Sequence, residues 1–353
     1  MNKTRIQWID FARVLAILTV VFCHCLDNIY HIIDPNVVTT LSISSKIFVF
    51  GGYAIGRLGV PFFLMITGYL LLDRVYDSEK ITGFWSRNCK HLLICTIIWC
   101  VIYEAFLIFV LHQDFNLVSV ISEILLLKPL NISHFWYMPM IIGMYILIPF
   151  ASTALRNLDN EIIFKAVTFF LIICSIIPFI LLILNIYGID GLSEQISLGY
   201  SGGIYGIYIV IGYLIKKDYF KSINNYKLIL TIIISAIITV IFQIFSFNHD
   251  YAYYLWYEFP FLLIISVWLF ELISRLKTIK FYNIISFLSK FSFAVFLIHI
   301  IFVKTISQAI INININSSIK VMILMMVVLL LSYLSAHIIY KIPKIGKYIL
   351  YIK

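Results

Sequence analysis

The sequence predicts an all-α membrane protein that crosses the bilayer about ten times. Of its 353 residues, 62% are hydrophobic and only 12% are charged, a composition typical of multi-span membrane proteins and not of soluble domains. The apolar runs are about 20 residues long, the length of a membrane-spanning helix. Strands of a membrane barrel are about 10 residues long and alternate polar with apolar residues, which these runs do not.

Ten apolar stretches account for most of the chain, with boundaries that are approximate. We expect spans at 9–30, 56–72, 92–111, 135–152, 163–185, 200–215, 228–247, 254–273, 291–311 and 320–340. The first is expected to be a retained helix and not a signal peptide, because it contains charged and polar residues and no A-x-A-like site follows it.

Two shorter segments and the lack of long loops complete the expected organisation. Segment 37–55, which contains Gly51 and Gly52, is predicted to be a short amphipathic or re-entrant piece before the second span. Segment 115–128 is predicted to be an interfacial helix. No stretch of about 50 residues remains for a soluble domain, so residues 1–353 are expected to form a single integral-membrane domain.

The distribution of positive charges predicts how the protein is oriented in the membrane. Most of the 26 lysines and arginines fall in the segments that would be cytoplasmic if the N-terminus is inside, so the positive-inside rule places both termini in the cytoplasm. The net charge of +9 follows mainly from this bias. The basic residues do not gather with aromatic ones, so no nucleic-acid partner is expected. The expected location is the cell inner or plasma membrane, among its lipids.

The six cysteines predict neither a metal site nor a disulfide. They lie in apolar runs or beside a basic loop, without the spacing of zinc ligands. Cys23 and Cys25 flank His24, but on a helix the two thiols diverge by about 200° and are unsuited to bind one metal ion together.

Arg13 and His24 share one face of the first span. They lie eleven residues apart, which is about three helical turns and about 16 Å along the axis. Polar groups inside a membrane are costly and are by default candidates for function. Asp10 is placed to pair with Arg13, and Asp27 is placed to hold the ring of His24. The alternatives are an interfacial anchor for Arg13 and a packing role for His24.

Further polar residues occur at membrane depth in other spans. Those in the outer parts are expected to form a polar cavity with His24; they are Arg57, Glu104, His134 and Glu258. Trp136 and Tyr137 are suited either to stack on a sugar or to form an aromatic belt. Thr67, beside Gly68, offers a hydroxyl or serves helix packing alone.

Arg87 and Lys90 lie one turn apart at the start of the third span, on the expected cytoplasmic side. Such a pair can hold phosphates. The alternative is ordinary positive-inside charge.

Four motifs, in order, resemble the membrane acyltransferase 3 family. They are Asp10, Arg13 and His24; Arg57 with Val60 to Leu71; His134-Phe135-Trp136-Tyr137 running to Gly143 and Tyr145; and Phe296-Leu297-Ile298-His299. Thr67 stands where the family commonly has Ser. Lys90 stands where it usually has the second of two arginines three residues apart, and Lys is a poorer bidentate phosphate ligand.

The resemblance implies a ten-helix inner-membrane enzyme that moves an acyl group from cytoplasmic acyl-CoA onto an envelope carbohydrate or lipid-linked saccharide, with Arg13 and His24 as the essential pair. We expect His24 to act as general base, Asp27 to orient it, and Arg13, Arg87 and Lys90 to hold acyl-CoA, the co-substrate. No bound cofactor is expected. Acetyl is the expected acyl group and succinyl stays open. The expected substrate-binding residues are Arg57, Thr67, His134, Trp136, Tyr137, Glu258 and His299.

Direct transfer is expected, because Cys23 and Cys25 are turned about 100° away from His24. Candidates to stabilise the oxyanion of the reaction are Arg57, His299 and Thr67.

Two other functions fit parts of the pattern. An exporter or flippase of a polysaccharide or lipid-linked saccharide would also need many spans and a polar interior. No inverted repeat or pair of broken helices supports it, although Pro61 and Pro139 weaken that objection. The membrane-sensor half of an amino-acid racemase is disfavoured because no soluble domain is expected. The acceptor and the oligomeric state stay open.

Overall fold

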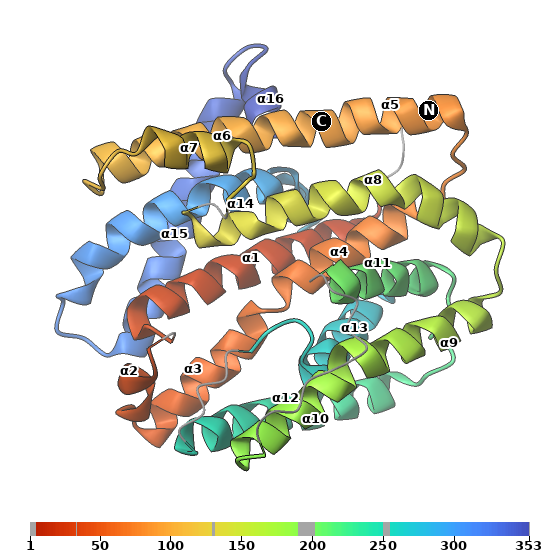
Figure 1. Ribbon diagram of the computed structural model, residues 1–353, viewed down its shortest axis with the longest axis horizontal. Helices are drawn as coiled ribbons and strands as arrows, with labels where there is room; N and C mark the ends of the chain where they lie inside the picture. The colour runs from red at the N-terminus through yellow and green to blue at the C-terminus, as the bar shows by residue number, and fades with distance from the viewer. Residues whose placement is uncertain (1–4, 33, 129–130, 190–201, 250–254, 353) are drawn as a thin grey trace.

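The computed structural model describes residues 5–32, 34–128, 131–189, 202–249 and 255–352 (Figure 1). All regular secondary structure in these ranges is helical. A helix satisfies its backbone hydrogen bonds within one segment, which apolar runs surrounded by lipid require. The all-α prediction is confirmed.

Nineteen helical segments are described in chain order. They are α1 (Gln7–Tyr30), α2 (Pro35–Thr39), α3 (Ile43–Gly56), α4 (Gly59–Leu71), α5 (Ser78–Phe84), the π-helix η1 (Trp85–Lys90), α6 (His91–Phe109), α7 (Leu117–Ile124), the 3-10 helix η2 (Ser133–Trp136), α8 (Tyr137–Arg156), α9 (Asn160–Leu171), the π-helix η3 (Ile172–Ile176), α10 (Ile177–Ile186), α11 (Gly202–Lys216), α12 (Asn225–Asn248), α13 (Pro260–Ser274), α14 (Tyr282–Ile311), α15 (Ser317–Tyr340) and α16 (Gly346–Ile349).

Helices coincide with all ten predicted spans. Among the described residues, 8 helices are long and apolar enough to cross a membrane. The predicted sixth and eighth spans correspond to α11 and α13, which are apolar but shorter; residues 200, 201 and 254 of those spans lie outside the described ranges. The protein is therefore a polytopic membrane protein, while the exact number of crossings and the side of each terminus stay predictions.

The prediction of a separate short piece at 37–55 is wrong. Helix α3 leads almost directly into α4, and Ile43–Leu71 forms one apolar run of 29 residues. The glycines of α3 serve close packing and not a turn. A Cβ atom on Gly52 would lie 2.8 Å from the Leu26 side chain, and one on Gly56 would lie 2.7 Å from the Cβ atom of Cys23.

The predicted interfacial segment does contain a helix, α7. Leu117, Val118 and Ile121 are exposed on it, as a helix lying on the membrane surface requires. Its position at the interface stays a prediction.

Helix α1 lies at the centre of the bundle and contacts α3, α4, α13, α14 and α15 (Figure 1). Its buried face carries small side chains at Ala12 and Ala16, both fully buried, which let neighbouring helices approach closely. The residues of α1 therefore face several other helices at once.

Helices α4 and α11 touch backbone to backbone. A Cβ atom on Gly68 would lie 1.7 Å from the carbonyl oxygen of Ile209, and one on Gly212 would lie 2.1 Å from that of Met65. The packing role considered for Gly68 is thus present, and it fixes the position of the adjacent Thr67.

We expect Gly68→Ala to lower the thermal stability of the protein. The added methyl group meets backbone and not a flexible side chain, so α4 and α11 must separate, and such overpacking costs about 1–3 kcal/mol or more. Thermal unfolding in detergent would measure the loss. Gly143→Ala on α8 is the matched control, because a Cβ atom there meets nothing within 4 Å. Equal melting temperatures for the two variants would contradict this account of the contact.

Candidate functional site

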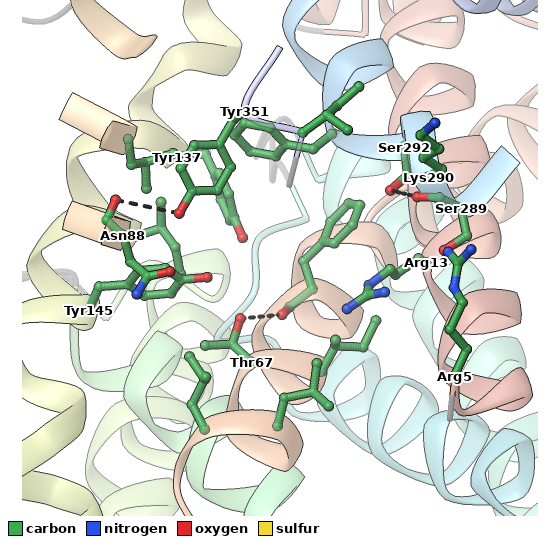
Figure 2. Close-up of a pocket in the computed structure, with 18 of the residues that line it drawn as sticks. Arg5, Arg13, Thr67, Asn88, Tyr137, Tyr145, Ser289, Lys290, Ser292 and Tyr351 are labelled. Atoms are coloured by element: carbon green, nitrogen blue, oxygen red, sulfur yellow. Dashed lines mark hydrogen bonds between the residues drawn. The ribbon is translucent and has the colours of Figure 1, made fainter. Parts of the chain in front are cut away.

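A cavity of about 390 Å³ opens among α1, α4, α8, α14 and the C-terminal segment (Figure 2). Four cations line it, and none of its described lining residues is acidic. The polar and charged lining residues are Arg5, Arg13, Thr67, Arg74, Asn88, Tyr137, Tyr145, Ser289, Lys290, Ser292 and Tyr351. In Figure 2, Arg5 and Arg13 lie on one wall, and Tyr137 and Tyr145 lie on the opposite one.

The Asp10 carboxylate pairs with Arg5 and Arg13, two of the cations that line the cavity. This carboxylate is buried, with Arg13 Nη1 3.3 Å and Arg5 Nε 3.1 Å from its two oxygens. The hydroxyl groups of Ser289 and Tyr282 donate to the same carboxylate over 2.7 and 2.8 Å. The predicted pairing of Asp10 with Arg13 is confirmed, and the carboxylate also joins α1 to α14.

Thr67 and Tyr137, two of the predicted substrate-binding residues, line this cavity. The Thr67 hydroxyl donates to the Phe63 carbonyl one turn earlier, over 2.9 Å. This bond keeps the side chain of Thr67 close to its own helix.

His24, His134 and His299 converge at a second place, here called the histidine cluster. The ring centroids of His24 and His299 lie 5.3 Å apart, those of His24 and His134 6.1 Å, and those of His134 and His299 5.1 Å. The three residues come from α1, η2 and α14. The cluster thus joins the three histidines that the sequence placed in separate spans.

Hydrogen bonding fixes the tautomer of His299. Its Nδ1 lies 2.8 Å from the Phe296 carbonyl and 3.1 Å from that of Val295. Carbonyl oxygens only accept, so Nδ1 carries the proton and Nε2 of the neutral ring is an acceptor. That Nε2 and both ring nitrogens of His134 are buried without a protein partner. Unpaired buried polar groups are costly, which makes these nitrogens candidates to bind a polar ligand.

Tyr137 and Phe296 connect the cavity to the histidine cluster. Their ring centroids lie 5.4 Å apart, and Tyr137 lines the cavity. The Phe296 ring lies 5.3 Å from the ring of His134 and 6.1 Å from that of His299. The two sites are therefore neighbours, joined across a pair of aromatic rings.

Arg57 lies in an aromatic cage, here called the Arg57 cluster (Arg57, Tyr53, Trp136, Trp256 and Tyr257). Its guanidinium donates to the hydroxyl groups of Tyr53 and Tyr257 and lies 4.4 Å from the Trp256 ring centroid. Trp136 stands 5.6 Å from Trp256 and 5.7 Å from Tyr257. Arg57 is midway along the apolar run Ile43–Leu71, so its predicted place at the outer end of a span is wrong, because α3 extends that span.

Charged side chains surround His24 at a longer range. Arg57 and Lys304 act electrostatically on its imidazole and on the Asp27 carboxylate. Asp27 Oδ1 is buried without a partner, and no hydrogen bond links Asp27 with His24 in the described structure. Lys304 was not among the predicted site residues. One feature of the sequence could have indicated Lys304: it is one of the few basic residues outside the segments expected to be cytoplasmic.

The comparisons with known proteins give the class of the chain. A family model described as an acyltransferase domain matches residues 6–337. The chain belongs to the acyltransferase 3 family. The matched range contains Arg13, the histidine cluster and the Arg57 cluster, and the apolar helices make the chain a multi-pass membrane member of this family.

A local similarity adds a second comparison. Over 144 residues, 38% of this chain, the acyltransferase is 30% identical to the serine/alanine racemase of Enterococcus gallinarum, and the aligned part covers 18% of that protein. No solved structure matches the chain.

Two predicted carboxylates, Glu104 and Glu258, line cavities other than the one that contains Arg13. Glu258 lines a separate cavity of about 150 Å³ with Ser175, Phe179 and Phe259. Glu104 accepts a hydrogen bond from Asn131 over 3.4 Å and lies beside the buried Glu123 of α7. Of the residues expected to share an outer cavity, His24 and His134 lie together and Arg57 acts on His24 at longer range, whereas Glu258 and Glu104 line two other cavities.

Arg87 and Lys90 lie outside the cavity of the acyltransferase that contains Arg13. Both are exposed and line an open hollow of about 420 Å³ with Ser86, His91 and Tyr348. Sequence reasoning missed the cations that do line the cavity beside Arg13, which are Arg5, Arg74 and Lys290. It had counted them only as orienting charge.

The described residues contain no group of three or more His, Cys, Asp or Glu side chains arranged to hold a metal ion.

Proposed function

We propose that this acyltransferase moves an acyl group, acetyl in the first place and succinyl as the alternative, from cytoplasmic acyl-CoA to a hydroxyl group of an envelope carbohydrate or lipid-linked saccharide. The observation that carries the proposal is the adjacency of a cation-lined cavity and a histidine cluster, joined through Tyr137 and Phe296. An anionic donor and a hydroxyl acceptor require these two environments side by side.

The cavity suits the donor. Its volume of about 390 Å³ is in the range of small-molecule sites. Arg5, Arg13, Arg74 and Lys290 supply charge and hydrogen-bond donors for the diphosphate of CoA. Apolar side chains such as Phe63, Ile66 and Ile141 offer contacts to the neutral arm that leads to the thioester.

His24 is the general base of the proposed reaction. It takes the proton of the acceptor hydroxyl while that oxygen attacks the thioester carbonyl. The carbon–sulfur bond then breaks, the ester forms, and the CoA thiolate recovers the proton from the His24 imidazolium. Direct transfer of this kind needs no thiol of the protein.

The surroundings of His24 suggest distinct roles for its neighbours. Neutral His299 offers a lone pair at Nε2, so it suits a hydrogen bond from the acceptor hydroxyl or from His24 and not the stabilisation of an oxyanion. Arg57 is a permanent cation whose Nε is buried without a partner, and it is the better oxyanion donor of the two. Asp27 and Lys304 set the local charge.

The Arg57 cluster suits the acceptor. Trp136 and Trp256 are half-buried and present aromatic faces, on which sugar rings commonly lie. An acceptor held there would place a hydroxyl near the histidine cluster. This assigns the aromatic residues to binding in addition to packing.

Transfer of label from acyl-CoA tests the proposal. Purified protein in vesicles, given radiolabelled acetyl-CoA or succinyl-CoA and a glycolipid extract of the envelope, is expected to place label in the saccharide fraction. Absence of label with both donors, together with passage of a labelled saccharide across the vesicles without acyl-CoA, would establish an exporter instead. Label on the protein itself before acceptor is added would contradict direct transfer.

A further inference from the structure

Helix α7 carries a buried carboxylate, that of Glu123, a residue only 1% exposed. It accepts hydrogen bonds from the Ser119 hydroxyl and from the backbone N–H of Asn131, each over 3.1 Å. The Lys128 ammonium lies 3.3 Å from one of its oxygens. A buried charge persists only where such partners satisfy it, so Glu123 is tied to the backbone at Asn131.

Glu104 of α6 holds the same asparagine from a second side. It accepts from the side-chain amide of Asn131 over 3.4 Å, and its carboxyl group is hydrogen-bonded to that of Glu123. Two carboxyl groups can bond to each other only if one of them is protonated. Glu123 already accepts from Ser119 and Asn131 beside a lysine, so the proton belongs to Glu104.

Asn131 begins the short segment that brings His134 into the histidine cluster. The Phe135 N–H donates to the Ile132 carbonyl over 3.0 Å, which closes a tight turn directly after Asn131. Both ring nitrogens of His134 lack a protein partner in the described structure, and its ring centroid lies 5.4 Å from that of Tyr103 and 4.7 Å from that of Phe135. The direction of the imidazole therefore depends on ring packing and on the backbone that starts at Asn131.

The helix that carries Glu104 is itself tied to α14. Tyr103, the preceding residue, donates its hydroxyl to the Leu297 carbonyl over 2.7 Å. Leu297 lies two residues before His299. Helix α6 thus fixes the segment of His134 relative to the helix that supplies His299.

The small space around the two glutamates shows how they can act. The cavity that Glu104 and Glu123 line with Cys100 and Ile132 holds only about 10 Å³, about the space of one water molecule. A sugar or an acyl group does not fit there. The two carboxyl groups therefore act on the chain and not on a substrate.

We propose that Glu123, assisted by Glu104, is a positioning residue for His134: it holds Asn131 so that the ring nitrogens of His134 meet the acceptor hydroxyl in the histidine cluster. This rests on the proposed function, because it gives His134 to the acceptor. A change at Glu123 is then expected to impair use of the acceptor and to leave the binding of CoA, in the separate cavity, as it is.

The kinetics of label transfer from acetyl-CoA to a glycolipid extract of the envelope test the proposal. Glu123→Ala is expected to lower kcat/KM for the acceptor about tenfold, the scale of one lost buried hydrogen bond, while the affinity for CoA stays within about twofold. Glu123→Asp keeps the charge but shortens the reach towards Asn131, so a severalfold loss is expected in a protein that still folds. Glu161→Ala, in an exposed ion pair on α9, is the matched control and should change neither quantity.

Two amide variants test the hydrogen bonds. Glu123→Gln should keep kcat/KM for the acceptor within about threefold of the wild type, because its oxygen still accepts from the Asn131 N–H. Glu104→Gln should match the wild type, because an amide can donate as a protonated carboxyl group does. A loss in Glu104→Gln as large as that in Glu123→Ala would overturn the assignment of the proton to Glu104.

A double-mutant cycle tests whether Glu123 acts through His134. If it does, Glu123→Ala in a His134→Ala background should lower kcat/KM for the acceptor by less than about twofold, because the positioned ring is already gone. Fully multiplicative losses would overturn the proposal. So would a Glu123→Ala variant with a lower melting temperature and wild-type kinetics, or one that loses CoA affinity as much as acceptor use, because Glu123 would then serve the fold alone. Failure of the wild type to transfer label at all would instead overturn the proposed function.

Discussion

Replacement of His24 by alanine is expected to lower the rate of acyl transfer by about 10²–10⁴-fold, the usual contribution of a positioned general base. The two neighbouring histidines are expected to compensate poorly, because their rings occupy other positions in the cluster. His299 Nδ1 is engaged with backbone carbonyls, and His134 lies on η2, behind the rings of Phe135 and Phe296. Initial rates with labelled acyl-CoA would measure the loss, and the affinity for CoA should stay within about twofold.

The control for this variant is His249→Ala. His249 is exposed at the end of α12, away from the cavity and the cluster, so the rate should not change. A His24→Ala enzyme that keeps a tenth or more of the wild-type rate would show that another group abstracts the proton. A loss of CoA affinity equal to the loss of rate would point to a structural role for His24.

Within one helix, the sequence predicted relative positions and one contact that the structure contains. The direction of Arg13 relative to His24 follows from helical periodicity alone, and so does the pairing of Asp10 with Arg13 one turn away. Ser289 and Tyr282, which complete the coordination of Asp10, come from α14, some 270 residues further on. No local pattern contains that information, because it depends on which helix packs against α1.

The sequence could not show which polar residues of different helices lie next to one another. His134 and His299 each looked like one polar residue in an apolar span, and a span does not reveal which neighbour it faces. The position of Arg57 depended on whether Gly52 and Gly56 end a helix or pack against one. Glycine serves both purposes, and only the contacts with Leu26 and Cys23 decide between them.

The sequence did not single out the cations that line the cavity, because positive charge in a membrane protein also sets its orientation. Arg5, Arg74 and Lys290 obey the positive-inside rule, so their presence required no other explanation. The C-terminal segment was hidden for a different reason. Residues 341–352 are too short and too irregular to show a periodic pattern, yet they supply Tyr348 to the hollow and Tyr351 to the cavity.

Asp10→Ala is expected to destabilise the folded protein by about 1–3 kcal/mol, the typical cost of leaving buried hydrogen-bonding groups without their acceptor, because the side chains of Arg5 and Arg13 are 48% and 33% exposed and water can solvate their charges. Asp10 is only 2% exposed, and its loss leaves the Arg5 and Arg13 guanidinium groups and the Ser289 and Tyr282 hydroxyl groups without their common acceptor. Thermal unfolding in detergent, with ligand-free protein, would measure the effect as a lower melting temperature. Glu161→Ala is the control, because the Glu161–Lys165 pair is exposed and such pairs contribute little.

Asp10→Asn separates the two roles of this carboxylate. The amide oxygen can still accept from Ser289 or Tyr282, so we expect most of the stability to return. The negative charge that holds Arg13 against α1 does not return, and Arg13 is then free to leave its place on the cavity wall. The folded Asn variant should therefore bind CoA more weakly than the wild type. Wild-type CoA affinity in that variant would show that Asp10 stabilises the junction of α1 and α14 without positioning Arg13 for the donor.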